Sequence, residues 1–116
     1  MPGIARRISL FTQQEIRSLI RSARLVSRQP GLDIRIAPSL QAFGRILIVT
    51  PRASGNSPAR NLIRRRFKAL FYQEKLYELG HDVVIFCKKE SAKLDYHQLK
   101  AILSNALQTA TTSTNS

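Results

Sequence analysis

The sequence is poor in the residues that build catalytic and metal centres in proteins. Among 116 residues it holds one cysteine, two histidines and seven acidic residues. The single cysteine, Cys87, excludes an internal disulfide and a multi-cysteine metal site, and we interpret it as a buried strand residue. The aspartates and histidines lack the spacing of a metal site or of an acid–base pair. We therefore expect neither catalytic nor metal-binding residues in this chain.

Long apolar runs are also missing. No run approaches the roughly 18 residues of a membrane span, and Arg6 and Arg7 interrupt the apolar residues that could begin a signal peptide. We expect a cytoplasmic protein without a membrane partner. The length suits one domain. We assign residues 1–108 to this domain and the small polar residues 109–116 to a disordered tail.

Negative charge is scarce, and positive charge is concentrated. Nineteen basic residues against seven acidic ones give a net charge of +12. Residues 1–70 carry the whole excess, with 13 arginines and one lysine against Glu15 and Asp33. Arginine forms forked contacts with phosphate, and no helix combines a basic face with exposed aromatic anchors for a membrane surface. The composition therefore indicates a nucleic-acid partner.

Hydrophobic spacing and capping signals predict a mixed α/β two-layer sandwich with the element order α-β-β-β-α-β-α. Thr12 and Glu15 form the pattern of a capping box at the first helix. Ser57 as N-cap, Pro58 in the first turn and Gly80 as C-cap predict one long helix. In chain order we expect a helix from 12 to about 23, strands over 25–28, 32–36 and 45–50, a helix over 58–79, a strand over 83–87 and a helix over 96–108. The strands over 45–50 and 83–87 are compact β-branched runs, which predicts interior positions in the sheet.

The long helix carries a basic face. At about 100° per residue, one side of the helix gathers five polar residues, and the apolar stripe lies on another side. These residues are Arg60, Asn61, Arg64, Arg65 and Lys68. A solvated helix face normally mixes charges of both signs, but residues 60–73 contain no acidic residue. The helix N-terminus and the small-residue loop before it, with Arg52, Gly55 and Asn56, would add N–H groups for phosphate. We predict that loop and helix together bind RNA.

Five aromatic residues outside the expected core could stack on unpaired bases. These are Phe11, Phe43, Tyr72, Tyr77 and Tyr96. Aromatic side chains pack against apolar neighbours more often than they stack on bases, so packing is the expected role for each.

The residues Gly55-Asn56 followed by Arg60-Asn61-x-x-Arg64-Arg65 resemble the "RNR" signature of the bacterial ribonuclease P protein subunit. The order of elements over about residues 9–107 is similar to that family as well. Four positions depart from its usual pattern. Leu62 stands at the second arginine of the signature, Ala53 and Ser54 replace a lysine and an apolar residue, and Ile16 replaces a phenylalanine. The chain resembles a divergent member.

The resemblance implies an α/β sandwich shared with a domain of a small-subunit ribosomal protein, with a left-handed strand–helix–strand crossover. It also implies an accessory subunit of an endoribonuclease that removes the 5′ leader of precursor tRNA, with the catalytic groups and Mg²⁺ held mainly by an RNA subunit. The basic helix and its loop would bind the ribonuclease P RNA, and a cleft between the first helix and the sheet would take the leader. Arg17, Ile34 and Ile36 are the expected cleft residues.

Three other functions remain open at this point. A ribosomal or ribosome-associated RNA-binding protein would use the same chemistry, although this chain lacks a long basic tail. An autonomous ribonuclease would need paired catalytic groups that the sequence does not supply. A duplex-DNA reader would need a two-helix reading unit with a short turn, so we expect no DNA partner.

Overall fold

The computed structural model describes residues 3–114, with the side chains of Ala92 and of residues 110–114 left aside. Four strands form one sheet in the order β1-β2-β4-β3. The strands are β1 (Arg24–Arg28), β2 (Leu32–Pro38), β3 (Ile46–Val49) and β4 (His81–Cys87). The α-helices are α1 (Ile4–Arg7), α2 (Gln13–Ser22), α3 (Ser57–Gln73) and α4 (Tyr96–Thr114), and the short 3-10 helices are η1 (Arg52–Ser54), η2 (Leu76–Leu79) and η3 (Lys89–Lys93). The predicted mixed α/β fold is confirmed.

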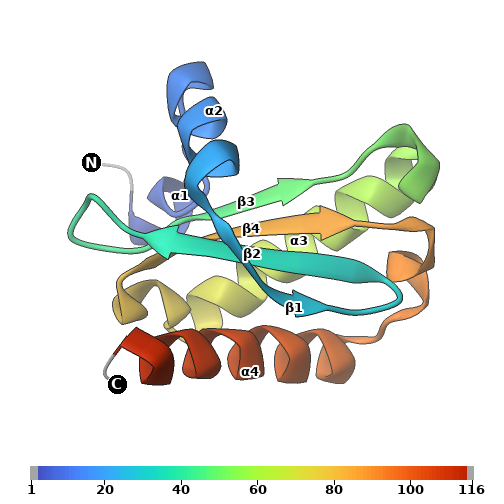
Figure 1. The fold of residues 1–116 in the computed structure, drawn as a ribbon. Coiled ribbons are helices and arrows are strands. Elements are labelled where there is room, and N and C mark those ends of the chain that lie inside the picture. The colour runs from blue at the N-terminus through green and yellow to red at the C-terminus, as the bar shows by residue number, and fades with distance from the viewer. Residues whose placement is uncertain (1–2, 115–116) are drawn as a thin grey trace.

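The sheet combines both strand directions. β4 pairs antiparallel with β2 and parallel with β3. In Figure 1 both β3 and β4 point to the right with β3 above β4, while α3 passes behind the sheet. The β3–α3–β4 connection is therefore left-handed, as the resemblance implied and against the common rule. This crossover leads the chain directly from the end of β3 into the loop before α3.

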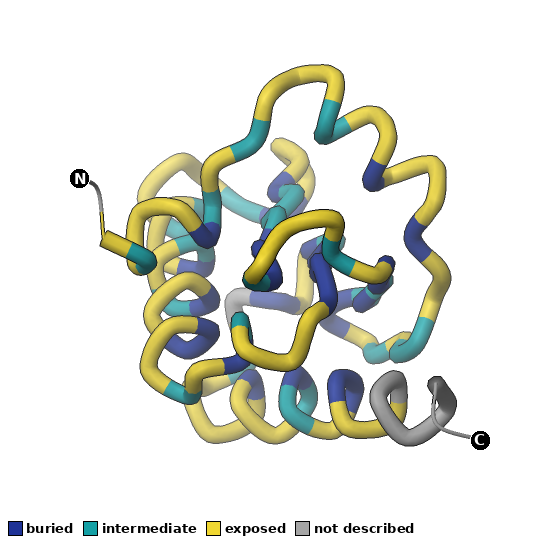
Figure 2. The backbone as a smooth tube through the Cα atoms, turned by 90° about the vertical axis from the view of Figure 1, so that its left-hand side faces the viewer, coloured by how far each residue is buried: buried dark blue, intermediate teal, exposed yellow. Residues whose placement is uncertain are grey.

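Helices cover the two faces of the sheet unequally. α3 and α4 pack on one face, where Ile34, Ile36 and Ile85 meet Phe67 and Leu103 in the main core. Figure 2 shows the buried residues of α4, at the bottom of the view, recurring along the side that faces the sheet. The other face carries only the ten-residue α2 and a smaller cluster around Leu19 and Val84. Much of this second face is consequently less deeply covered.

Local capping signals explain where the outer helices begin. The Thr12 hydroxyl accepts a hydrogen bond from the Glu15 N–H at 3.1 Å, and the Glu15 carboxylate accepts one from the Thr12 N–H at 2.9 Å. The predicted capping box is therefore confirmed. Asp95 and Gln98 make the equivalent reciprocal pair at the start of α4, both at 2.9 Å. Side chains within three residues of each other determine these two starts.

The predicted boundaries of the helices need three corrections. α3 ends at Gln73 rather than 79, because Lys75 adopts a left-handed conformation (φ 53°) and the chain continues into η2. Its N-cap is Asn56 rather than Ser57. α4 continues to Thr114, so residues 109–114 extend the helix that was expected to end at 108, and residues 115–116 lie outside the described part. The short helix α1 was not predicted.

The run before Pro51 was predicted to be an interior strand, and this was wrong. β3 lies at an edge of the sheet, and Leu47, Ile48 and Val49 are only partly buried. β3 is apolar on both sides for another reason. One side packs in the main core and the other side packs in the smaller cluster around Leu19 and Val84.

Within residues 3–114, no helix has the length and apolarity to cross a membrane.

Candidate nucleic-acid interface

The basic face of α3 is present on the surface of the folded molecule. Ile63, Phe67, Leu70 and Phe71 turn one side of α3 into the core. The opposite side exposes Asn61, Arg65 and Lys68, while Arg60 and Arg64 are half-buried. The predicted separation of the apolar stripe from the cations is therefore confirmed.

Four of the predicted residues line one open depression on α3. Asn61, Arg64, Arg65 and Lys68 surround it together with Ser57 and Pro58, and its volume is about 700 Å³. Arg64 donates a hydrogen bond from Nη1 to the Asn61 Oδ1 at 3.4 Å, so the amide orients the guanidinium beside it. A shallow basic depression on a helix suits a phosphate backbone better than an enclosed small molecule.

Among the described residues, the cations of α3 form no ion pairs with carboxylates. In the described part of the chain, no ion pair involves Arg60, Arg64, Arg65 or Lys68. Four acidic residues are instead engaged with other cations: Glu15 and Asp82 with Arg45, Asp33 with Arg28 and Lys88, and Glu74 with Lys100. The mutual repulsion of these like charges is relieved when a polyanion binds.

The loop before α3 is fixed by its own hydrogen bonds. The Ser54 hydroxyl donates to the Pro51 carbonyl at 2.6 Å, and the Asn56 side chain accepts from the Ala59 N–H at 3.0 Å. Gly55 has φ 144°, a conformation that disfavours other residues, and an added Cβ would lie 3.3 Å from the Ala59 Cβ. Asn56 therefore caps the helix, while Arg52 remains exposed beside it.

Arg60 differs from the other cations of this surface. Its Nη2 donates to the Ser57 hydroxyl at 3.2 Å, and its Nη1 reaches the Thr50 carbonyl at 3.5 Å. Part of its guanidinium is thus used to hold the first turn of α3 to the end of β3. A guanidinium carries five N–H groups, and the Nε–H of Arg60 is buried, so the second N–H of each terminal nitrogen is left to meet phosphate.

The structure adds two lysines that the sequence pattern did not indicate. η3 packs against both η1 and α3, which brings the exposed Lys89 and Lys93 to this side of the molecule. Residues 71–116 are neutral as a group, so the uneven charge along the chain gave no signal for these lysines. Only the packing of η3 against η1 in the folded molecule shows that these lysines lie beside the loop.

The prediction of cleft residues was wrong for Ile34 and Ile36. Ile34 and Ile36 are 0% and 1% exposed and belong to the main core, on the α3 side of the sheet. Successive residues of a strand point to opposite faces, so the residue of β2 that faces α2 between them is Arg35. Arg17 is exposed on α2, about 160° around the helix from the buried Leu19. It therefore faces solvent rather than the sheet.

Arg35 and Phe86 lie together on the second face of the sheet, and the predicted cleft residues did not include them. The Arg35 guanidinium carbon lies 5.6 Å from the centre of the Phe86 ring, and both residues are partly exposed. Leu47 and Val49 extend this partly buried surface on the neighbouring strand. The period-two alternation of β2 could have identified Arg35, whereas Phe86 looked like an ordinary core residue.

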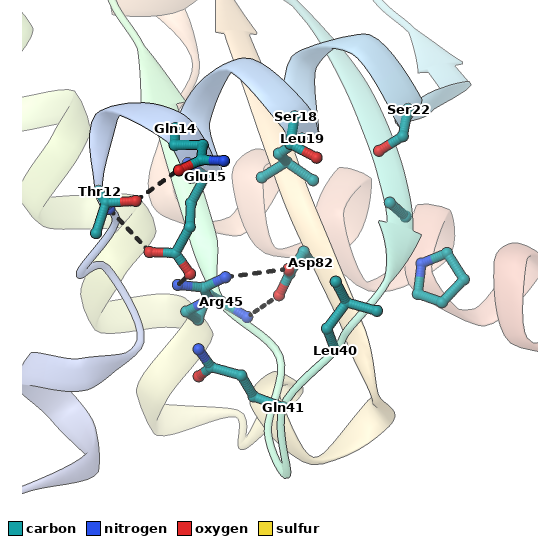
Figure 3. A pocket seen from close by; sticks show the side chains of 12 residues that line it. Thr12, Gln14, Glu15, Ser18, Leu19, Ser22, Leu40, Gln41, Arg45 and Asp82 are labelled. Carbon is teal, nitrogen blue, oxygen red and sulfur yellow. Dashed lines mark hydrogen bonds and ion pairs between the residues drawn. The ribbon is translucent and has the colours of Figure 1, made fainter.

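A buried arginine joins α2 to the sheet. Arg45 is 6% exposed, and its Nη1 donates to the Glu15 carboxylate at 2.8 Å and to the Leu10 carbonyl at 3.0 Å. Its backbone N–H donates to Asp82 at 2.9 Å, and its guanidinium covers the Phe11 ring at 4.3 Å. Figure 3 shows Glu15, Arg45 and Asp82 among the residues that line a pocket of about 270 Å³ between α2 and the loop after β2. The network holds α2 in place over the sheet.

The two carboxyl groups of this network respond differently to their surroundings. The Thr12 N–H and then the Arg45 guanidinium lower the pKa of Glu15 below its usual value. Burial raises the pKa of Asp82, and its hydrogen bond and charge contacts with Arg45 oppose this. In the described part of the chain, no group of three or more His, Cys, Asp or Glu residues could hold a metal ion.

Solved structures share this fold. The chain superimposes on the RNase P protein of Staphylococcus aureus with a TM-score of 0.74 and 16% identity, covering 89% of this chain and 94% of that one. For the RNase P protein of Thermotoga maritima the TM-score is 0.71 and the identity 18%, over 85% and 94% of the two chains. At such identities the likeness shows the fold alone.

Sequence comparison gives the family. The family model described as Ribonuclease P matches residues 4–111. The ribonuclease P protein component of Borrelia duttonii is 31% identical over 104 residues, which are 88% of this chain and 90% of that protein. The component of Petrotoga mobilis is 34% identical over 68 residues, which are 54% and 58% of the two chains. Because the family model spans nearly the whole sequence, this chain belongs to the ribonuclease P protein family.

Proposed function

We propose that this chain, as the protein component of the endoribonuclease ribonuclease P, binds a catalytic RNA subunit through α3 and the loop before it. In this role it helps to remove the 5′ leader of precursor tRNA in the cytoplasm. The observation that carries this proposal is the α3 face of Arg60, Arg64, Arg65 and Lys68, which no described carboxylate neutralises. Lys and Arg side chains that neutralise phosphates release counterions, which drives association with RNA.

Each part of the interface has a distinct task in this proposal. Arg64, Arg65 and Lys68 meet phosphates in the open depression on α3, with Asn61 orienting Arg64. Arg52 and the backbone of Gly55 provide contacts from the loop. Asn56 and Arg60 hold the loop and the first helical turn in the geometry that these contacts need. Lys89 and Lys93 enlarge the basic surface beside the loop.

The leader of precursor tRNA is proposed to bind on the second face of the sheet. Arg35 and Phe86 offer a cation and an aromatic ring on a surface that α2 covers only in part. Single-stranded RNA is commonly bound by such a combination of stacking and charge. Leader and RNA subunit would thus occupy opposite faces of the sheet, and the Arg45 network would fix α2 beside the leader.

Magnesium is proposed to stay with the RNA subunit. The carboxylates of this chain are dispersed among separate ion pairs, so the protein's contribution is to bind and orient RNA. Added positive charge from the protein lowers the repulsion between the RNA subunit and precursor tRNA, which in the free RNAs must be screened by cations.

Reconstitution with the cognate ribonuclease P RNA tests the assignment. At low Mg²⁺ concentration the protein should stimulate accurate 5′ cleavage of precursor tRNA, whereas protein without the RNA subunit should not cleave. Failure to stimulate cleavage would contradict the assignment. Cleavage by the RNA-free protein would instead indicate an autonomous ribonuclease.

Salt dependence tests the position of the interface. Replacing Arg64 and Arg65 together by Gln should weaken binding to the RNA subunit and reduce the slope of log K against log salt by about one for each phosphate that is no longer neutralised. The matched control is replacement of Arg17 and Arg21, which are exposed on α2. An unchanged slope in the α3 variant would place the RNA interface elsewhere on the protein.

A further inference from the structure

The basic face of α3 ends in an aromatic residue that the proposed interface does not use. Tyr72 follows Lys68 by four residues and Arg65 by seven, so these three side chains share one side of the helix. At about 1.5 Å per residue, Tyr72 lies roughly 6 Å beyond Lys68 along the axis. The Tyr72 side of the helix therefore continues the line of cations towards the C-terminal end of α3.

The side chain of Tyr72 lies on the surface of α3 and not in the core. Its exposure is 41%, whereas Phe67 and Phe71 of the same helix are 0% exposed. Packing against the core, the usual role of an aromatic side chain, therefore does not account for Tyr72.

The ring of Tyr77 packs against one face of the Tyr72 ring. The Tyr72 and Tyr77 ring centres lie 6.1 Å apart, and the ring planes differ by 19°, which is a stacked arrangement. Tyr77 is only partly exposed and packs against the main core. Its carbonyl accepts a hydrogen bond from the Gly44 N–H at 2.7 Å, which ties η2 to the loop between β2 and β3. Tyr77 is thus fixed, and it limits the orientations available to Tyr72.

The early end of α3 creates this pair. In a continuous helix, residues five apart would project about 140° from each other and could not stack. The left-handed Lys75 ends the helix and turns η2 back, which brings Tyr77 against Tyr72. The turn at Lys75 therefore positions a flat aromatic surface at the end of the basic face.

We propose, on the basis of the RNA-binding function proposed above, that Tyr72 is a stacking platform for an unpaired base of the RNA subunit. The base stacks on the Tyr72 ring while the adjoining phosphates contact Lys68 and Arg65. Every nucleobase has a π-face, so this contact adds affinity without demanding a particular base. The RNA segment bound by α3 would accordingly include at least one nucleotide outside a continuous duplex.

Substitutions of Tyr72 separate stacking from other roles of the side chain. Tyr72→Ala should weaken binding of the cognate ribonuclease P RNA by about 5- to 150-fold, the usual range for removal of one stacked base. Tyr72→Phe keeps the ring and should stay within about twofold of the original affinity. Tyr72→Leu keeps an apolar side chain but lacks a π-face, so it should bind as weakly as Tyr72→Ala. Full affinity of the Leu variant would overturn the proposal.

Salt dependence distinguishes this contact from the charged ones. A stacked base releases no counterions, so Tyr72→Ala should leave the salt slope unchanged, while Arg65→Gln should reduce it by about one. If Tyr72→Ala binds normally and the arginine variants do not, the stacking proposal fails and the proposed function stands. If the unsubstituted protein does not bind the RNA, the proposed function itself fails.

A fluorescent residue gives a direct readout, because the chain contains no tryptophan. Tyr72→Trp places a single indole at the proposed stacking position, and Leu40→Trp places one at an exposed residue of the loop after β2, on the α2 side of the molecule. Saturating RNA should quench the indole at position 72 strongly and the indole at position 40 little. Equal quenching at both positions, or none at position 72, would rule out the platform.

Discussion

At the scale of single residues, Leu62 is the position at which the Arg60-Asn61 motif of α3 differs from the signature that it resembles. Leu62 is 39% exposed on α3, with Arg65 and Arg66 three and four residues further along. An exposed leucine between cations contributes no charge to RNA binding. The neighbouring Arg64, Arg65 and Lys68 retain the basic character of the face.

Restoring the charge at this position should strengthen RNA binding. Leu62→Arg is expected to raise affinity for the RNA subunit by about 5- to 10-fold and to increase the salt slope by about one, since it adds one phosphate contact. Filter binding at several salt concentrations measures both. Leu40→Arg is the matched control, because Leu40 is 95% exposed on a different surface. A similar gain in both variants would show that added charge acts without regard to position.

The Glu15–Arg45 contact predicts a defined effect of pH on stability. The pKa of Glu15 is lowered by the Thr12 N–H and by Arg45, so its carboxylate stabilises the fold at neutral pH. This stabilisation is present above the ordinary glutamate value of 4.5 and is lost as the pH falls through the lower folded-state pKa. Glu15→Gln should therefore be less stable at pH 7 by no more than about 1 kcal/mol, because the carboxylate is partly exposed.

Denaturant titrations of both proteins between pH 7 and pH 3 measure this difference. It should shrink as the pH falls below 4.5, because protonation then increasingly favours the unfolded state of the original protein. Comparing the two proteins cancels the opposite contribution of Asp82, whose raised pKa favours the folded state as the pH falls. A difference that persisted unchanged at pH 3 would show that Glu15 acts through packing rather than charge.

At the scale of secondary-structure elements, the start of α3 combines a structural task with a binding task. Asn56 caps the helix through the Ala59 N–H, and the same turn presents Gly55 and Arg52 to RNA. Asn56→Ala should reduce the free energy of unfolding by about 1 kcal/mol, the usual cost of removing an N-cap. Thermal or urea unfolding measures this reduction.

Asn56→Asp separates the two tasks. Aspartate caps a helix as well as asparagine does, so stability should be kept. Its negative charge lies beside the proposed phosphate contacts, so RNA affinity should nevertheless fall. Unchanged RNA binding in the Asp variant would show that phosphate does not approach this end of α3.

At the scale of the whole molecule, Cys87 reports on the integrity of the core. It is 3% exposed in β4, and burial raises the pKa of its thiol to about 11 from 9.0. The thiolate is the reactive form, so at pH 8 its population should be roughly 100-fold lower in the folded protein than in the unfolded chain. Alkylation by iodoacetamide, followed by mass spectrometry, should therefore be at least that much slower without denaturant. Rapid alkylation of the folded protein would mean that β4 is accessible without unfolding.

The binding surfaces also depend on the whole molecule. The left-handed crossover leads the chain from β3 through the loop into α3 on one face of the sheet. α2 is held on the opposite face by the Arg45 network. The two proposed RNA-binding surfaces on opposite faces are therefore joined through the four-stranded sheet.

Sequence alone determined the features that arise within a few residues of chain. The Thr12–Glu15 capping box, the basic face of α3 and the burial of Cys87 follow from local spacing and composition, and the structure contains all three. Tertiary structure decided where α3 ends, that β3 lies at an edge, and that Lys89, Lys93 and the Tyr72–Tyr77 pair join the basic side. The physical reason is that a capping box or a helical face is completed by neighbours three or four residues apart. Strand order, the end of a long helix and a turn that stacks two rings are instead determined by packing among residues distant in sequence.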